Sequence, residues 1–397
     1  MGTVKPWWKS GSRSALLLAL AASSTLLAPA SAQNDGAAKE LAKWSQQDLA
    51  KAEAFVQKFL EELKGENPER AVAAFDTTAM LDQVFDGIGD AKQRAEMKRA
   101  AKTSIGPTLL TSLKSVSSGA SKWKRLVVVD GTLRARVRFA GDDGIAIVDL
   151  ELGQSGDAWA FRDLHNLTLG ASMVGEMRTM MVLMSPSLSP GLLSRWFGPE
   201  TYTATDIDNV GKLVKAFQGG NLEGAKALFE KLPKSLQESS PITAVQMQIL
   251  AAGSDQDAYV AALEGAAARF PAPKFRMTLV DAHFLRKRWK QAIRCLDEAM
   301  QGIERDAMLL MLRSTIELQS GDIATARKTT MEALALEPDS LEVLAGSLDI
   351  LLAAKDWAAV AKTMRAMEKS DQYDFKGQLD DEVWQEFRQQ PEAKPWL

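Results

Sequence analysis

The sequence of 397 residues predicts an α+β domain followed by an all-α array of helical repeats. Three observations predict this order. Apolar residues recur at helical spacing over residues 38–116, alternate as in β-strands over 123–167, and follow a 34-residue period in the second half. The chain is also too long for one ordinary core, so we expect two or more domains.

Residues 1–32 have the three parts of a secretory signal peptide. The segment begins with Lys5, Lys9 and Arg13 and no acid, continues with a short apolar run, and ends in small residues at Ala30 and Ala32. We therefore expect a periplasmic or secreted protein that is cleaved near Ala32. Retention of the segment as a membrane anchor is the alternative.

The α+β domain is expected to place its helices on one face of a four-stranded antiparallel sheet. Helices are predicted at 38–64, from Asn67-Pro68 onward, and at about 90–116 with a break near Gly106-Pro107. The four β-rich runs that follow are separated by turn signals such as Asp130-Gly131. Helices that precede a run of strands are typical of an α+β fold.

Changes in composition and periodicity give the expected domain boundaries. Residues 185–202 contain three prolines and little periodicity, which is typical of a linker. The expected ranges are a signal peptide at 1–32, the α+β domain at 38–184, the linker at 185–202, helical repeats at 203–375 and a C-terminal capping segment at 376–397.

The repeats show small residues in fixed columns of the 34-residue period. Units are predicted at 273–306, 307–340 and 341–374, with a weaker one at 239–272. The columns hold Ala292, Ala326 and Val360, then Ala299, Ala333 and Met367, and one unit earlier Ala258 and Gly265. Small side chains let two helices approach closely where they cross, so these columns predict helix crossings.

This period, with its small-residue columns, resembles the tetratricopeptide repeat. The resemblance implies stacked pairs of antiparallel helices whose first helices line a concave groove that binds another protein. The groove positions it implies are Met277, Asp281, Phe284, Met308, Met311, Thr315, Leu318 and Asp349. The alternative is that Met277, Met308 and Met311 are ordinary core residues.

A second motif ends the predicted sheet. It consists of Trp159, Asp163, Gly170, Ser172, Val174 and Arg178. Their spacing resembles the segment that ends the sheet in periplasmic phospholipid carriers of the Mla system and, more broadly, the cone-shaped NTF2-like fold. That resemblance implies a pocket between helices and sheet for a lipid or another apolar ligand. A filled cone without a ligand is the alternative.

Three arginines, Arg134, Arg136 and Arg138, alternate with apolar residues and therefore share one face of a strand. The predicted hairpin places Arg136 opposite Asp149 and Arg134 opposite Glu151, which favours cross-strand ion pairs on a solvated face. A site for an anionic head group is the alternative.

Residues that carry catalysis are scarce. The chain has two histidines, one cysteine and none of the common zinc, phosphate-loop or nucleophile motifs, so we expect no enzymatic activity, metal or cofactor. A formal net charge of −3 argues against nucleic acid. The sequence predicts an exported scaffold that binds a protein through its repeat groove. The alternative is a periplasmic carrier of an apolar ligand that the repeats dock to a membrane complex.

Overall fold

The computed structural model of the protein describes residues 41–65, 69–116, 120–141, 144–155, 158–168, 170–184, 202–253, 255–270, 273–301, 303, 305–369, 373–377 and 379–397. These residues form two units, one ending at Phe275 and the other running from Arg276 to Leu397, here called the N-terminal and C-terminal units. The expected signal peptide at 1–32 and nearly all of the expected linker lie outside the described residues.

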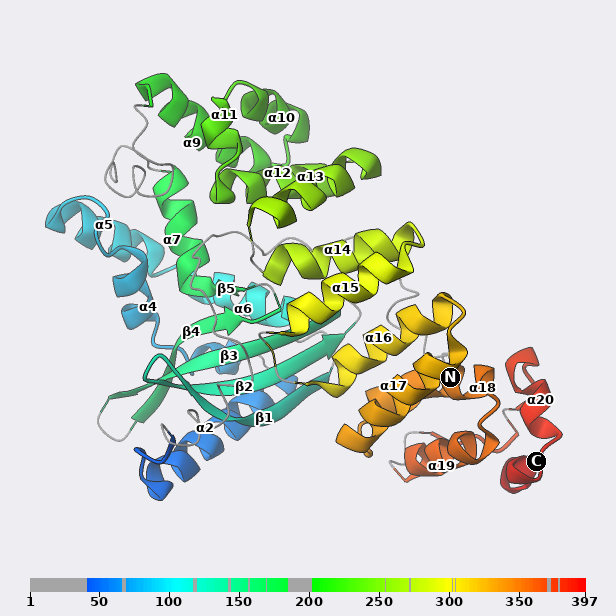
Figure 1. Cartoon of the computed structure of the whole chain (residues 1–397). Coiled ribbons are helices and arrows are strands. Elements are labelled where there is room, and N and C mark those ends of the chain that lie inside the picture. The colour runs from blue at the N-terminus through cyan, green and yellow to red at the C-terminus, as the bar shows by residue number, and fades with distance from the viewer. Residues whose placement is uncertain are drawn as a thin grey trace. The chain divides into compact units, whose positions relative to one another are not determined.

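The sheet of the N-terminal unit has five antiparallel strands in the order in which they occur along the chain (Figure 1). They are β1 (Ala120–Val129), β2 (Thr132–Gly141), β3 (Gly144–Ser155), β4 (Ala158–Asn166) and β5 (Ala171–Ser172). The four predicted strands are therefore confirmed, and a two-residue strand is added at the edge. The register pairs Arg136 with Asp149 and Arg134 with Glu151, as the hairpin predicts.

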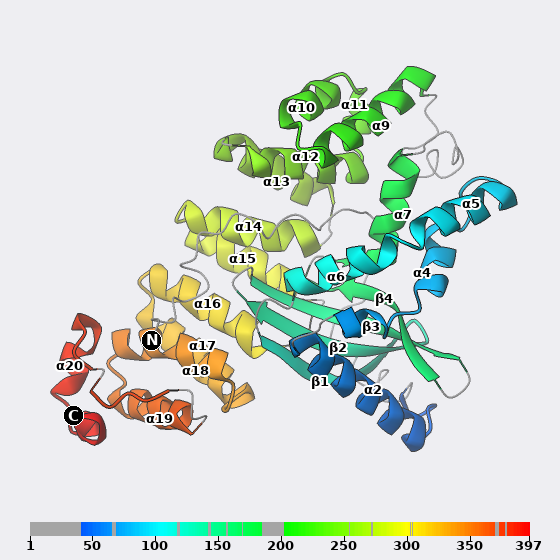
Figure 2. The same cartoon turned by 180° about the vertical axis from the view of Figure 1, so that it is seen from behind.

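One face of this sheet is apolar, and helices cover it (Figure 2). The helices of this layer are α2 (Gln46–Lys64), α3 (Glu69–Val72), α4 (Thr77–Val84), α5 (Ala91–Ala101), α6 (Ile105–Val116) and α7 (Met173–Met184). The predicted break near Gly106-Pro107 is misplaced, because α5 ends at Ala101 and α6 begins at Ile105. Pro107 is tolerated in the first turn of α6, where a backbone N–H has no partner within the helix.

Aromatic rings fill part of the space between the helices and the sheet. The ring centroid of Phe161 on β4 lies 4.9 Å from those of Phe55 and Phe59 on α2, and 5.3 Å from that of Phe75. The backbone of Phe161 also bonds to the chain on either side of Phe75, through Ala74 and Asp76 at 2.8 Å each. This cluster therefore holds α2 and the α3–α4 connection against β4.

The N-terminal unit continues with two helical hairpins. Their helices are α9 (Ala204–Gln218), α10 (Leu222–Glu230), the short α11 (Lys234–Gln237), α12 (Ser240–Ala252) and α13 (Gln256–Arg269). Apolar residues of α9, α10, α11 and α12 share one core. The helices of the weaker predicted unit at 239–272 are thus α12 and α13.

The C-terminal unit consists of three further hairpins and an end segment. The hairpin helices are α14 (Pro273–Leu285), α15 (Trp289–Met300), α16 (Ala307–Gln319), α17 (Ile323–Leu336), α18 (Leu341–Ala353) and α19 (Trp357–Glu368). The first residues of α14 still belong to the N-terminal unit. First helices begin at 273, 307 and 341, and second helices at 289, 323 and 357, so both recur every 34 residues as predicted. Among them, α18 packs on both α16 and α17.

The turn inside each of these hairpins repeats as well. Lys287, Gly321 and Lys355 occupy equivalent positions and all have a left-handed backbone, with φ of 57°, 87° and 53°. Glycine adopts this conformation without strain, whereas lysine does so at a cost. The helix that follows the turn is capped by Asp322 or Asp356 in the second and third hairpins.

The small-residue columns are largely confirmed. Ala292, Ala299, Ala326 and Ala333 are all buried, with at most 1% of each residue exposed. The columns are wrong one hairpin earlier, where Ala258 is only partly buried and Gly265 is exposed. The hairpin of α12 and α13 is one residue shorter than 34, which moves the buried position to Ala266.

The end segment packs on the last hairpin. It contains η3 (Glu382–Trp384), α20 (Gln385–Arg388) and η4 (Pro391–Trp396). Phe387 and Trp396 are buried in one core with Val360 and Met367, the two larger residues in the small-residue columns. The indole Nε1 of Trp396 donates a hydrogen bond of 2.6 Å to Glu368 at the end of α19.

Candidate functional site

The predicted groove residues lie on the first helices α14, α16 and α18, and their exposure differs. Asp281 and Asp349 are exposed; Met277, Phe284 and Leu318 are partly buried; Met308, Met311 and Thr315 are buried. The predicted groove therefore includes both accessible and inaccessible side chains. Partner binding at these positions stays a prediction.

The buried groove positions contribute to helix packing. The Met311 side chain on α16 lies against Gly346 of α18, and the Thr315 hydroxyl donates to the Met311 carbonyl at 3.0 Å. Phe284 packs against Trp289 of its own hairpin, with the two ring centroids 5.3 Å apart. Of the predicted positions, Asp281 and Asp349 are the exposed ones.

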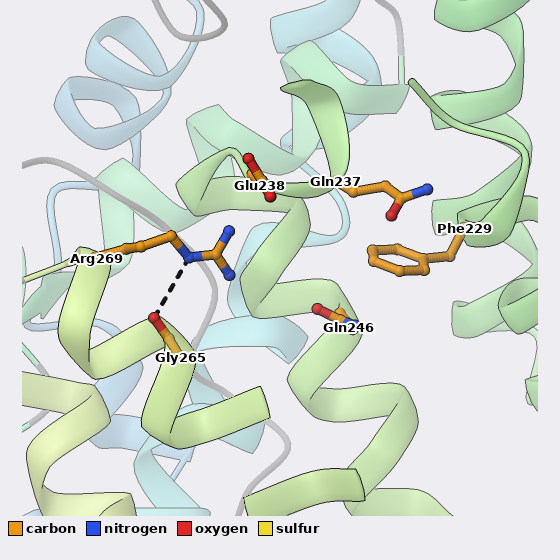
Figure 3. Close-up of a pocket in the computed structure, with 6 residues that line it drawn as sticks. All are labelled: Phe229, Gln237, Glu238, Gln246, Gly265 and Arg269. Atoms are coloured by element: carbon orange, nitrogen blue, oxygen red, sulfur yellow. Dashed lines mark hydrogen bonds between the residues drawn. The ribbon is translucent and has the colours of Figure 1, made fainter. Parts of the chain in front are cut away.

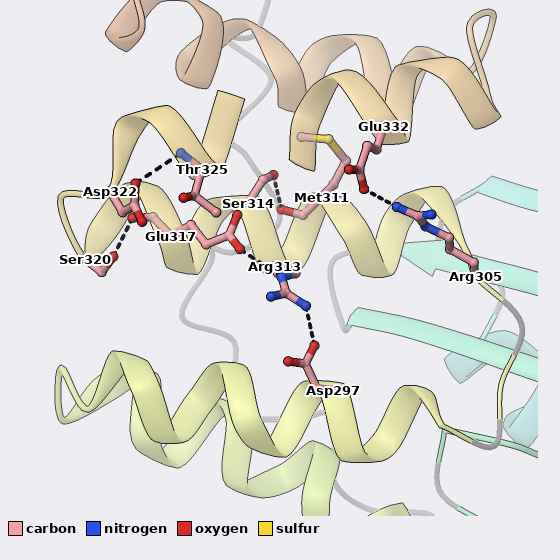
Figure 4. A network of polar contacts seen from close by, with 10 residues as sticks. All are labelled: Asp297, Arg305, Met311, Arg313, Ser314, Glu317, Ser320, Asp322, Thr325 and Glu332. Atoms are coloured by element: carbon pink, nitrogen blue, oxygen red, sulfur yellow. Dashed lines mark hydrogen bonds and ion pairs between the residues drawn. The ribbon is translucent and has the colours of Figure 1, made fainter. Parts of the chain in front are cut away.

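A network of ion pairs joins consecutive hairpins in the same unit (Figure 4). The Arg313 guanidinium on α16 contacts Asp297 on α15 and donates from Nε to Glu317 Oε1 at 2.8 Å. Glu317 is buried, and its backbone carbonyl accepts a hydrogen bond of 2.7 Å from Ser320. Arg313 therefore links two hairpins and also neutralises a buried carboxylate.

The electrostatics of this network favour a charged arginine. Burial acts to lower the pKa of Arg313, but the hydrogen bond to Glu317 and the negative charge of Asp297 raise it on balance. No sequence motif predicted this network. The four-residue spacing of Arg313 and Glu317 on a helix was the available signal, because residues four apart are neighbours on a helix surface.

The charged face of the sheet lies opposite the helical layer. Arg136 binds Asp149 with two hydrogen bonds, Nε to Oδ1 at 2.7 Å and Nη2 to Oδ2 at 2.9 Å. The Arg134 guanidinium lies 4.0 Å from the Glu151 carboxylate. The predicted pairing is thus confirmed, but the prediction of a solvated face is wrong, since Asp149 is 0% and Arg138 2% exposed.

His165 on β4 lies beside these charged side chains. Its Nε2 lies 3.0 Å from Glu151 Oε2 and 3.7 Å from Asp163 Oδ2. The hydrogen bond with His165 lowers the pKa of Glu151, although burial opposes the shift. Burial raises the pKa of Asp163, against the effects of His165 and two backbone N–H groups. Arg136 is therefore already bound by a carboxylate, and binding of an anionic ligand at this face stays a prediction.

The motif that ends the sheet has a structural explanation at its centre. Asp163 Oδ1 accepts hydrogen bonds from the backbone N–H groups of Leu164 at 2.7 Å and Val174 at 3.0 Å. Val174 lies in the first turn of α7, where backbone N–H groups have no partner within the helix. Ser172 provides a second such cap by accepting from Gly175 at 3.0 Å.

Gly170 and Arg178 also position this helix, whereas Trp159 packs elsewhere. Gly170 has φ of 63°, which favours glycine at the turn before α7. Arg178 on α7 donates to the carbonyl oxygen of Gln83 at 2.9 Å, and the indole of Trp159 lies 5.9 Å from that of Trp44. The motif therefore attaches α7 to the end of β4 and to α4.

The part of the chain that the structure describes lacks two other kinds of feature. There, no three His, Cys, Asp or Glu side chains are grouped so that they could hold a metal ion. None of the described helices combines the length and apolar character needed to cross a membrane.

Comparison with known proteins gives one result. Residues 224–385, from α10 to the first residue of α20, match the family of the tetratricopeptide repeat. No curated protein and no solved structure matched the chain. Residues 224–385 are thus similar to tetratricopeptide repeats, as their 34-residue period indicates. The resemblance of the α+β domain to NTF2-like folds and Mla carriers stays a prediction.

Proposed function

We propose that this protein is an exported scaffold that binds another protein through the first helices of its repeats. The observation that carries the proposal is the strict repetition of three hairpins, with helix starts every 34 residues and one turn conformation throughout. Stacked hairpins of this kind present a preformed surface, so that little ordering entropy is lost when a partner binds.

The accessible first-helix residues indicate the chemistry of the partner. Asp281 and Asp349 occupy equivalent positions two repeats apart, and both are exposed. Leu318 offers a partly buried apolar side chain on the intervening repeat. We therefore expect a partner segment with basic side chains for the two aspartates and an apolar side chain for Leu318.

A charge reversal tests this proposal. The Asp281→Arg/Asp349→Arg double variant is compared with the wild type in a cross-linking pull-down from the native compartment. Asp339→Arg is the matched control, since Asp339 is an exposed acid of the same unit outside the first helices. The double variant should lose one specific cross-linked protein that the control retains. Equal recovery of that protein by both variants would contradict groove binding.

Export is tested by the mass of the mature protein. Cleavage near Ala32 predicts loss of the first 32 residues from protein isolated from the periplasm or the medium. Retention of those residues in a membrane fraction would instead show an anchor.

Lipid carriage by the α+β domain is the weaker proposal. The Phe161 ring contacts those of Phe55, Phe59 and Phe75 where a ligand would lie between α2 and β4, and Phe59 also contacts Phe75. Mass spectrometry of gently purified protein separates the two proposals, because a carrier retains a stoichiometric lipid and a scaffold does not.

A further inference from the structure

The hairpins of the N-terminal unit contain an open pocket of about 440 Å³ (Figure 3). It is lined by Phe229 of α10, Gln237 of α11, Glu238, Gln246 of α12, and Gly265 and Arg269 of α13. The helices α10 and α13 are the second helices of their hairpins, and both pack on α12. The residues that line the pocket do not include the first-helix positions Asp281 and Asp349.

The polar groups of this pocket are only partly used by the protein. Arg269 donates from Nε to the Gly265 carbonyl at 3.3 Å and forms no ion pair with any carboxylate among the described residues. Gln237 uses its amide N–H₂ on the Leu232 carbonyl at 2.8 Å, which leaves its amide oxygen to accept. In the same part of the chain, the Gln246 amide has no hydrogen-bond partner.

A second feature of the pocket is the glycine at residue 265. It lies inside α13, where glycine costs about 1 kcal/mol of helix stability relative to alanine. Close packing does not require this glycine, because a Cβ built on it meets no atom within 4 Å among the described residues. The missing side chain does leave the backbone of α13 open to the pocket, where Gly265 is a lining residue.

We propose that this pocket binds an extended peptide segment through a carboxylate. Arg269 binds the carboxylate, because a guanidinium with free N–H groups matches its two oxygens. The Gln237 and Gln246 amides bond to the peptide backbone, the Phe229 ring packs on a neighbouring apolar side chain, and Gly265 lets the peptide approach α13. The inference rests on the proposed function in taking the ligand to be a protein, but it assigns a second surface.

The one acid in the pocket does not oppose this assignment. Glu238 is exposed, and its carboxylate lies 3.7 Å from the Lys234 ammonium. Its charge is thus offset locally, whereas Arg269, whose guanidinium lies 5.6 Å from the centroid of the Phe270 ring, pairs with no carboxylate among the described residues. Figure 3 shows the Arg269 guanidinium and the Phe229 ring directed into the pocket from opposite sides, with Gln246 between them. This arrangement places the anionic and apolar ends of a ligand at different helices.

Peptide selection on the full chain tests the proposal. A random peptide library is selected against wild-type protein, and enriched peptides are synthesised with a fluorescent label for anisotropy titration. We expect enriched peptides to share a carboxylate that is required for binding. Synthesis with free and amidated C-termini distinguishes a terminal carboxylate, lost on amidation, from an Asp or Glu side chain, lost on change to Asn or Gln.

Two variants then locate the site. Gly265→Leu fills the pocket while improving helix propensity, and Arg269→Glu reverses the binding charge. Each should weaken binding at least about tenfold. Ala261→Leu and Lys226→Glu are matched controls on exposed positions of α13 and α10 outside the pocket, and should bind as the wild type does.

The outcomes distinguish this inference from the proposed function. Peptides that bind Gly265→Leu and Arg269→Glu as tightly as wild type, or that share no required carboxylate, overturn the pocket assignment. If the pocket assignment is correct, the Asp281→Arg/Asp349→Arg variant retains peptide binding whether or not the first-helix surface binds a partner. Thermal unfolding of Gly265→Leu, expected at or above the wild-type temperature, shows that lost binding does not result from unfolding.

Discussion

The methyl end of Met311 on α16 lies 3.3 Å from the position that a Cβ of residue 346 would occupy on α18. Gly346 therefore lets consecutive first helices pack closely, with the flexible methionine side chain filling the space between them. This contact joins two consecutive repeats. Substitutions at either residue therefore test how the hairpins stack.

Gly346→Leu should destabilise the C-terminal unit by about 1–3 kcal/mol, because the larger side chain separates α16 from α18. Gly346→Ala should stay within about 1 kcal/mol of wild type, since the Met311 tip can move and alanine favours the helix. Urea unfolding measures both. Adding Met311→Ala to Gly346→Leu should recover part of the loss, and a strictly additive double variant would contradict the contact.

The repeated turn predicts a stabilising substitution. Lys355 has a left-handed backbone that costs a non-glycine residue about 1 kcal/mol, so Lys355→Gly should raise stability by about that amount. Its exposed ion pair with Glu386 contributes little. Lys355→Ala removes the ion pair without relieving the backbone and is the control. The reverse change, Gly321→Lys, should lower the thermal unfolding temperature.

Substitutions of Arg136 and Asp149 should have strongly non-additive effects on the free energy of unfolding. Arg136→Met or Asp149→Leu alone should cost about 3–5 kcal/mol, because each removes one side of an ion pair in which Asp149 is fully buried. The double variant should recover most of this loss, since two apolar side chains can pack where the ion pair was. Denaturant unfolding of all four proteins in a double-mutant cycle measures the coupling. Equal losses that simply add would show that the two charges act independently.

The difference in stability between the wild type and Glu151→Gln should depend on pH. Its pKa in the folded protein is lowered, chiefly by the hydrogen bond with His165, so its contribution is present above the ordinary glutamate pKa and is lost as pH falls through the lowered value. The free energy of unfolding of the wild type should therefore exceed that of Glu151→Gln by up to about 1 kcal/mol near neutral pH. The two should be equal in strong acid. Urea unfolding at several pH values measures the difference, and a constant difference across pH would contradict it.

The repeats and the hairpin register were predictable because each depends on local spacing. A helix crossing at 34-residue intervals needs small residues, and this pattern placed the buried Ala292 and Ala326 correctly. The pattern failed at Gly265, since a hairpin one residue shorter changes the register without changing composition. The predicted hairpin between β2 and β3 likewise placed Arg136 opposite Asp149 and Arg134 opposite Glu151.

The predictions that failed depended on long-range burial. The sequence indicates that Arg138 shares a face with Arg136, but not that this face is shielded from solvent. The pocket at Arg269 was also missed, because it combines residues from α10, α11, α12 and α13 with no common motif. Helix periodicity shows which residues face inward on one helix, whereas a pocket depends on how several helices are arranged.

The pairing of Arg136 with Asp149 also limits how β2 and β3 can assemble. A slip of one residue would turn the arginines of β2 toward the phenylalanine-rich interior and leave Asp149 without a counter-charge. Hairpins misaligned by one residue are thus penalised on both sides of the strand. A chain that folds outside the cytoplasm, as proposed here, would gain from this safeguard against strand mispairing and aggregation.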